Sequence, residues 1–229
     1  MQFQDLPDRI AEIKGRIEAA QRRGGRGQGV RIVAVTKTHG PEAVLAAVRA
    51  GLTDVGENKV QEALGKQDAV GGGALPRWHL IGHLQRNKVK FLDRFDLFHA
   101  MDSARLADAI AEQGDKQGRA FDALMEVNVS GEASKGGFAV ADVAREGERL
   151  IAKAGVRVTG VMTMAPFDAD EATLRRVFAG AREAAETLRR VGHPAYELSM
   201  GMSGDYEVAV EEGATMVRLG TILFGERGQ

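Results

Sequence analysis

One lysine stands where its side chain could do covalent chemistry. Ile32, Val33 and Val35 belong to a short apolar run rich in β-branched residues, which predicts a buried strand. Lys37 follows at the carboxyl end of this run, and residues 38–41 form a turn that opens a helix. Most lysines at strand ends are simply solvated. A primary amine held in a binding site can instead condense with an aldehyde, so Lys37 is a candidate for Schiff-base chemistry.

Two pairs of small residues late in the chain suit a phosphate. Ser203–Gly204 and Gly220–Thr221 each follow a short apolar run, offering hydroxyl donors and room for backbone N–H groups, with a helix start adding a favourable dipole. An ordinary strand-to-helix turn has the same composition. Two such pairs after consecutive strands nevertheless favour a phosphate site. Arg218 shares a strand face with Gly220 by the two-residue alternation of strand side chains, so we expect it beside that site.

A lysine and a phosphate site together indicate two chemistries. The lysine could form a Schiff base with a sugar phosphate, as in an aldolase, or it could hold pyridoxal 5′-phosphate (PLP). Arg218 stays charged, so it would donate to an unprotonated ring nitrogen of PLP and weaken the ring as an electron sink. The other interpretation of Arg218 is a salt-bridged residue on the rim of the site.

Other candidate groups give weaker signals. Glu57 and Asn58 could donate or accept hydrogen bonds from a ligand, or could cap a helix. His79 and His83 would share a face of a predicted strand, but no third ligand accompanies them, and we predict no metal site. Lys135 lies in a glycine-rich loop and is the competing lysine.

The composition narrows the class of protein. The 229 residues contain 31 basic and 32 acidic residues, with no basic stripe that would favour nucleic acid. Cysteine is absent, so neither disulfides nor thiolate chemistry is available. The sequence begins without a signal-peptide pattern and contains no apolar run near the roughly 20 residues of a membrane-spanning helix. We therefore expect a cytoplasmic protein that does not contact a membrane.

The elements that position these residues alternate along the whole chain. A helix over residues 3–21 comes first, and strands then alternate with helices without a break in composition. This alternation predicts a single α/β domain over residues 1–229, a closed (β/α)8 TIM barrel with an extra N-terminal helix. An open doubly wound sheet is disfavoured because no Gly-x-Gly-x-x-Gly follows the first strand. The predicted strands are 31–35, 53–56, 77–84, 96–101, 121–129, 157–164, 197–202 and 216–219.

Ordered motifs along nearly the whole chain resemble one known family. The chain is similar to the pyridoxal phosphate homeostasis proteins, which are related to the N-terminal barrel of alanine racemase. The resemblance implies a PLP Schiff base on Lys37, and it implies Arg218 facing the ring nitrogen. It further implies Asn58 and Met202 near the cofactor. Ser203, Gly220 and Thr221 would hold the phosphate. The motifs lie at residues 33–38, 56–58, 60–62, 78–85, 87–88, 128–132, 134–135, 198–203, 217–221 and 224–225.

Two positions depart from the family pattern: Lys59 stands where tyrosine is common, and His39 replaces a frequent lysine. Both lie outside the implied cofactor-binding set. The departures therefore bear on partners or on secondary lysine effects rather than on the fold.

The resemblance implies a binding protein without turnover, which buffers PLP or delivers it to recipient apo-enzymes. A two-base racemase needs a second acid or base, which alanine racemase takes from a partner's C-terminal β-domain. Here only ten residues follow Leu219, and the two tyrosines, Tyr196 and Tyr206, have no evident place over the ring. We expect a monomeric protein that is not an enzyme. A PLP-dependent racemase or other PLP enzyme is the alternative.

Overall fold

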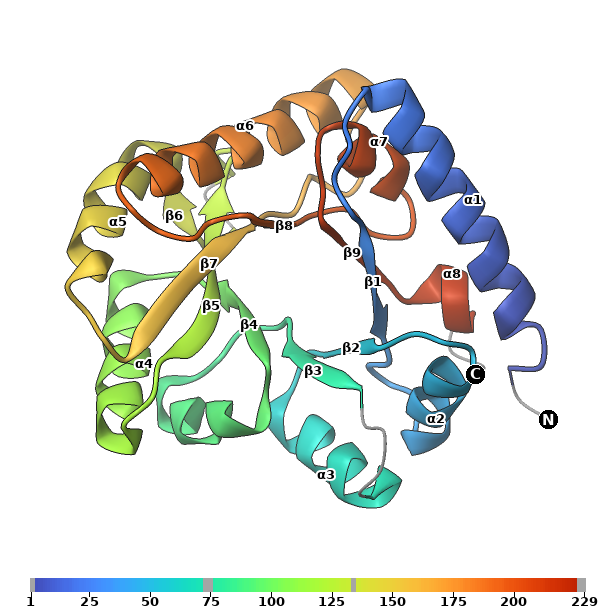
Figure 1. The fold of residues 1–229 in the computed structure, drawn as a ribbon, viewed down its shortest axis with the longest axis horizontal. Helices are drawn as coiled ribbons and strands as arrows, with labels where there is room; N and C mark the ends of the chain where they lie inside the picture. Colours follow the sequence, from blue (N-terminus) through green and yellow to red (C-terminus); the bar gives the residue numbers. More distant parts are fainter. Residues whose placement is uncertain (1–2, 72–75, 133–134, 226–229) are drawn as a thin grey trace.

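Eight parallel strands close into a barrel in the computed structural model, which describes residues 3–71, 76–132 and 135–225. Neighbouring strands pair in the order β1-β2-β3-β4-β5-β7-β8-β9, and β9 pairs with β1 to complete the ring (Figure 1). The predicted TIM barrel is confirmed. The barrel strands are β1 (Arg31–Val35), β2 (Asp54–Glu57), β3 (Arg77–Leu80), β4 (Leu97–Met101), β5 (Phe121–Asn128), β7 (Val156–Met162), β8 (Glu197–Ser199) and β9 (Met216–Leu219).

Helices form an outer ring around the strands (Figure 1). Local sequence sets several of their ends: Pro41 occupies the first turn of α2, and the Asp170 carboxylate accepts a hydrogen bond from the Thr173 N–H at 2.8 Å, capping α6. The helices are α1 (Leu6–Gly24), α2 (Pro41–Arg49), α3 (Val60–Val70), η1 (Arg86–Arg94), α4 (Ala104–Gln117), η2 (Val140–Asp142), α5 (Val143–Ile151), α6 (Glu171–Arg190), α7 (Tyr206–Glu211) and α8 (Thr221–Phe224).

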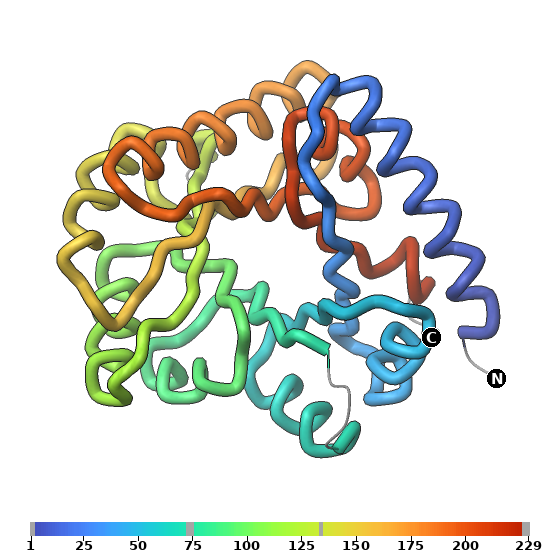
Figure 2. The backbone as a smooth tube through the Cα atoms, in the orientation of Figure 1, coloured from blue at the N-terminus to red at the C-terminus, as the bar shows by residue number. Residues whose placement is uncertain are grey.

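The extra helix α1, near the start of the described chain, packs against elements near its end. It lies beside α7 and α8, as the blue and red segments of Figure 2 show. Ile10, Ile13 and Ile17 recur at helical spacing and are buried on its inner face. Arg9 donates to the Leu223 carbonyl at 2.8 Å, and Arg23 pairs with Glu211 at 2.6 Å. Burial of an apolar stripe, bordered by these polar contacts, therefore holds the helix over the last strand–helix unit.

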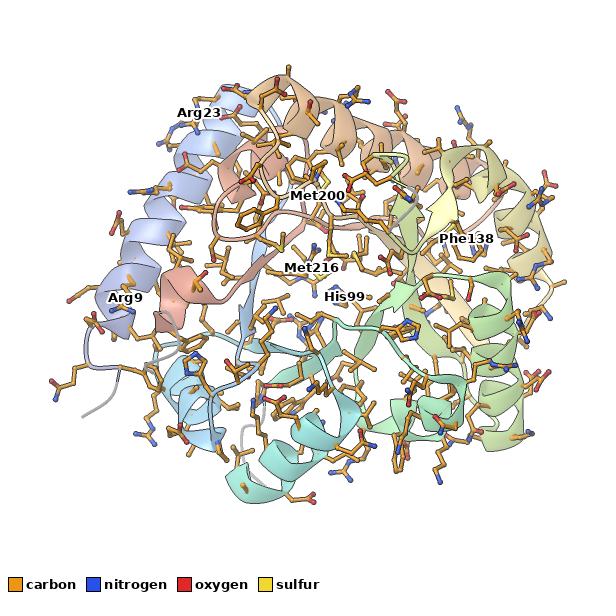
Figure 3. The ribbon with its side chains drawn as sticks, turned by 180° about the vertical axis from the view of Figure 1, so that it is seen from behind. Arg9, Arg23, His99, Phe138, Met200 and Met216 are labelled. Atoms are coloured by element: carbon orange, nitrogen blue, oxygen red, sulfur yellow. The ribbon has the colours of Figure 1, made fainter. Side chains whose placement is uncertain are left out.

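The barrel interior is filled by side chains. Met200 and Met216 are fully buried, and Figure 3 shows them near the centre of the ring together with His99. A (β/α)8 barrel is a packed core rather than a pore, so a binding site must form at one end of it. None of the helices among the described residues combines the length and apolar character needed to cross a membrane.

Three elements differ from the sequence-based expectations. A short strand β6 (Phe138–Ala139) pairs with β5 outside the barrel. The sequence did not predict this strand, because it is only two residues long and directly follows a glycine-rich loop. β3 ends at Leu80 rather than at residue 84, and beyond it Gly82 packs against the Asn58 backbone, where an added Cβ would lie 2.4 Å from the carbonyl oxygen. β8 likewise ends at Ser199 rather than at residue 202.

Candidate functional site

A pocket of about 630 Å³ opens at the carboxyl ends of the barrel strands. This is the end at which (β/α)8 barrels carry their binding sites. All seven residues predicted from the sequence to bind the cofactor line this one pocket, although they come from four separate parts of the chain. They are Lys37, Asn58, Met202, Ser203, Arg218, Gly220 and Thr221.

Lys37 extends from a loop that is fixed on both sides. The preceding residue, Thr36, is fully buried, and its carbonyl accepts a hydrogen bond from Lys66 Nζ at 2.8 Å. The following residue, Thr38, has a left-handed φ of 70°, and its N–H donates to Glu62 Oε1 at 2.8 Å. The Lys37 side chain itself is exposed to the pocket and makes no ion pair within the described part of the chain. Its amine is therefore available to a ligand.

The network under this loop is buried and charged. Lys66 Nζ lies 2.6 Å from Glu57 Oε1, and the Thr36 hydroxyl donates to the same carboxylate. Burial raises the pKa of Glu57, while the hydrogen bonds from Lys66 and Thr36 oppose that rise. Glu57 is therefore not a ligand-binding residue and does not cap a helix. Through its bonds to Thr36 and Lys66 it holds the start of the Lys37 loop in place.

Arg218 enters the pocket from β9, at its inner end. The residue is only 6% exposed, and its guanidinium donates to Ser199 Oγ at 2.6 Å and to the Thr163 carbonyl at 3.0 Å. Burial lowers the pKa of Arg218 to about 10, while Asp205 and Glu126 oppose that shift. At neutral pH the group is still a cation, so it can only donate hydrogen bonds. The alternative of a salt-bridged rim residue is wrong, because the guanidinium is buried and its bonds go to neutral oxygens.

The hydroxyls of Ser203 and Thr221 meet at one side of the pocket, with their oxygens 3.1 Å apart. The Ser203 oxygen also accepts from the Ile222 N–H at 3.3 Å. Within the described residues the N–H groups of Ser203 and Gly204 donate no hydrogen bond. Two hydroxyls and free backbone donors form a set that fits a phosphate.

Two carboxyl groups in the pocket were missed from the sequence: Glu126 is buried and Asp205 is partly buried. Burial raises the pKa of Glu126, and the nearby Asp102 raises it further. Burial also raises the pKa of Asp205, although its carboxylate accepts from the Met202 N–H at 2.6 Å. The signal for Glu126 was a charge among the otherwise apolar residues 123–127 of β5. His83 and Asp102 also line the pocket, most of the remaining wall is apolar, and the Phe167 side chain is 97% exposed at the mouth.

The other sequence candidates lie elsewhere or act differently. His79 and His83 do not share a strand face: His79 is buried inside the barrel, whereas His83 follows the end of β3, lines the pocket and bonds Asp102 at 2.9 Å. The described residues contain no cluster of three or more metal-ligating side chains. Lys135 lies 3.1 Å from Glu132 and is not among the residues that line the pocket, and Ser134, its partner in the motif, lies outside the described residues.

Asn128, the expected strand-end residue of β5, turns away from the pocket. Its amide donates to the Glu132 carbonyl at 2.9 Å, and its oxygen accepts from the Gly131 N–H at 3.0 Å. Its role is therefore to shape the loop that follows β5.

Fold and site together define a β/α barrel of the alanine racemase type. The family model described as "Alanine racemase, N-terminal domain" matches residues 9–228. An alanine racemase structure from Corynebacterium glutamicum shares the fold, with a TM-score of 0.74, 15% identity and coverage of 100% of this chain and 63% of that chain.

More similar relatives narrow this class. The pyridoxal phosphate homeostasis protein of Aquifex aeolicus is 41% identical over 223 residues, which cover 96% of this chain and 97% of the relative. PipY of Synechococcus elongatus, solved with PLP bound, is 34% identical with a TM-score of 0.83, covering 96% of this chain and 100% of that chain. The chain belongs to the pyridoxal phosphate homeostasis protein family.

Proposed function

We propose that this protein binds pyridoxal 5′-phosphate in the pocket and takes part in its homeostasis by buffering it or delivering it. One observation carries the proposal: an accessible lysine amine, a buried arginine and a phosphate-suited set of donors line the same pocket. Relatives at 41% and 40% identity named pyridoxal phosphate homeostasis protein, and a PLP-bound structure of PipY, support it.

Each group has a distinct role in this proposal. Lys37 holds the cofactor as a Schiff base between the lysine amine and the aldehyde carbon of PLP. The Ser203 and Thr221 hydroxyls bind the phosphate beside Gly220, which directly precedes α8. Asn58 and Met202 lie against the ring substituents.

Arg218 is the partner of the ring nitrogen. When bound, PLP supplies an electron sink for carbanion chemistry, and that sink is strongest when the ring nitrogen is protonated. A guanidinium has no acceptor and remains charged at neutral pH, so it keeps the ring nitrogen unprotonated. Arg218 therefore favours holding the cofactor over activating it.

A role without turnover agrees with the position of the tyrosines. Tyr206 is buried at the start of α7, and Tyr196 is 71% exposed; neither lines the pocket in the described structure. We propose that residues 1–229 act as one cofactor-binding domain, a monomer in the cytoplasm, with apo-enzymes as recipients. A PLP-dependent racemase or related enzyme is the second candidate, because buried Glu126 and partly buried Asp205 line the pocket and could act as acid or base groups.

The test is reconstitution with PLP followed by borohydride reduction and peptide mapping. We expect a yellow protein with its pyridoxyl adduct on Lys37, an adduct lost in Lys37→Ala and kept in the matched control Lys135→Ala. An uncoloured protein would refute PLP binding, and an adduct on Lys135 would refute the role of Lys37. Incubation of the loaded protein with L- and D-amino acids should give no multiple turnover; turnover would favour the second candidate.

A further inference from the structure

A continuous chain of hydrogen bonds crosses the barrel interior and ends at Arg218. Each of its side chains comes from a different strand, and His99 lies near the centre of the ring in Figure 3. All five residues are at most 6% exposed. The links are Asp54 Oδ1 to His79 Nε2 at 2.9 Å, His79 Nδ1 to His99 Nε2 at 2.8 Å, His99 Nδ1 to Ser199 Oγ at 2.8 Å and Ser199 Oγ to Arg218 Nη1 at 2.6 Å.

The two ends of the chain determine where every hydrogen lies. Arg218 can only donate, so Ser199 Oγ accepts from it and turns its own hydrogen to His99 Nδ1. His99 must then carry its proton on Nε2 and donate it to His79 Nδ1. His79 in turn carries its proton on Nε2 and donates it to the Asp54 carboxylate. All four bonds are satisfied with both imidazoles neutral and both protonated on Nε2.

The opposite direction leaves a buried group without a partner. If His99 donated from Nδ1, the Ser199 hydrogen would have no acceptor in the described residues, because His99 and Arg218 are the only side chains that bond this hydroxyl there. His99 Nε2 would then accept from His79 Nδ1, and His79 would need a second proton to bond Asp54. A buried unsatisfied hydroxyl and an extra buried charge both cost stability.

The far end of the chain is anchored at the opposite end of the barrel. Asp54 Oδ2 lies 2.9 Å from Arg77 Nη2 and accepts from the Thr53 hydroxyl at 2.8 Å. Although burial alone would raise the pKa of Asp54, the hydrogen bonds from His79, Thr53 and Arg77 hold it well below its usual range. The carboxylate is therefore a permanent acceptor at the base of the chain.

Arg218 needs such support because it is buried without a direct ion pair. No carboxylate of the described residues lies within 4.0 Å of its guanidinium, which bonds only Ser199 and the Thr163 carbonyl. Successive hydrogen bonds in a low-dielectric interior polarise one another. An anionic acceptor at Asp54 thus makes Ser199 Oγ a better acceptor for the buried cation.

We propose that Ser199, His99 and His79 are positioning residues, which hold the Arg218 guanidinium in its pocket-facing geometry through a one-directional relay from Asp54. The ligand that Arg218 then meets rests on the proposed function, whereas the relay itself is a property of the protein alone. Ser199 touches Arg218 directly, and the two histidines act through it.

The first test needs no cofactor. Long-range ¹H–¹⁵N NMR of uniformly labelled protein distinguishes imidazole tautomers, and we expect both His79 and His99 as neutral Nε2–H forms. The Arg218 Nη protons, assigned by their loss in Arg218→Lys, should exchange slowly in the wild type and rapidly in Ser199→Ala. A His99 proton on Nδ1, a doubly protonated His79, or slow exchange that persists in Ser199→Ala would overturn the relay.

The second test measures cofactor binding in matched variants. A glutamine side chain presents an acceptor and a donor at nearly the spacing of an imidazole, so His99→Gln should keep the direction of the relay, whereas His99→Leu cannot. We expect His99→Leu and Ser199→Ala to bind PLP at least about tenfold more weakly, with a shifted absorption spectrum, and His99→Gln to stay within about threefold of wild type.

The outcomes separate the two proposals. If the wild type binds no PLP, the proposed function fails. The tautomers of His79 and His99, measured without cofactor, still show whether the relay exists. If His99→Leu melts at a lower temperature but binds PLP with wild-type affinity and spectrum, its role is structural only and the positioning role is refuted. If His99→Gln and His99→Leu lost the same amount of PLP affinity, the assigned direction of the hydrogen bonds would likewise be refuted.

Discussion

Replacing Lys66 with methionine should destabilise the protein by removing the cation that lies under the Lys37 loop. Lys66 is 5% exposed and Glu57 is fully buried, and the second carboxylate oxygen of Glu57 has no hydrogen-bond partner in the described structure. Lys66→Met leaves this carboxylate buried without a counter-charge, at a cost of about 3–5 kcal/mol. For a protein of this size that corresponds to a decrease in Tm of roughly 6–20 °C.

The pH dependence of this loss identifies its cause. Burial already raises the pKa of Glu57, and Lys66→Met removes a group that lowers it, so the pKa in the folded variant rises further. A carboxyl whose pKa is higher in the folded state favours folding at low pH, and this contribution is lost as the pH rises through the folded pKa. The free energy of unfolding that Lys66→Met loses relative to the wild type should therefore be smaller near about pH 5 than near about pH 8.

Urea unfolding followed by circular dichroism at both pH values measures the effect. Lys116→Met on the exposed end of α4 is the matched control and should change the free energy of unfolding by no more than about 0.5 kcal/mol. Adding Glu57→Gln to Lys66→Met should recover part of the loss, because it removes the unpaired charge. An equal deficit at both pH values, or a double variant no more stable than Lys66→Met, would refute the reasoning.

Two further predictions concern the phosphate donors and the packing of the outer ring. Ser203→Ala should weaken binding of PLP about tenfold in a spectroscopic titration and leave binding of pyridoxal, which has no phosphate, unchanged; equal losses for both would contradict the phosphate assignment. Gly155→Ala should lower the free energy of unfolding by more than about 2 kcal/mol, since its Cβ would lie 1.9 Å from the Ala111 carbonyl oxygen. Gly15→Ala should instead raise the free energy of unfolding by up to about 1 kcal/mol, because Gly15 lies in the middle of α1 and an added Cβ would meet no atom within 4 Å. Thermal unfolding of both variants checks this pair, and a stable Gly155→Ala protein would contradict the close approach.

The sequence by itself determined the barrel and most of the candidate pocket. Apolar runs that alternate with amphipathic helices indicate a parallel sheet covered by helices, and eight such units favour its closure into a barrel. Once the strands were placed, their carboxyl ends identified Lys37, Arg218 and Ser203 as neighbours, because parallel strands of a closed barrel present those ends to one opening. These residues could be predicted since each follows directly from its position along its own strand.

Where strands end and which side chains meet inside the barrel were decided only by the tertiary structure. β3 stops at Leu80 and Gly82 then packs against the backbone of Asn58, so that His79 lies in the strand and His83 lies beyond it. Period-two alternation describes one strand and says nothing of partners across the barrel.

The same limit applies to Lys37 and Arg218. The sequence placed both residues at the pocket, but their supports come from elsewhere in the chain: Lys66 on α3 fixes the Lys37 loop, and His99 on β4 reaches Ser199 on β8. Such contacts form only when the ring closes and brings distant strands within hydrogen-bond distance. Local pattern therefore predicts the groups that face a ligand, and the closed barrel alone determines what holds them in place.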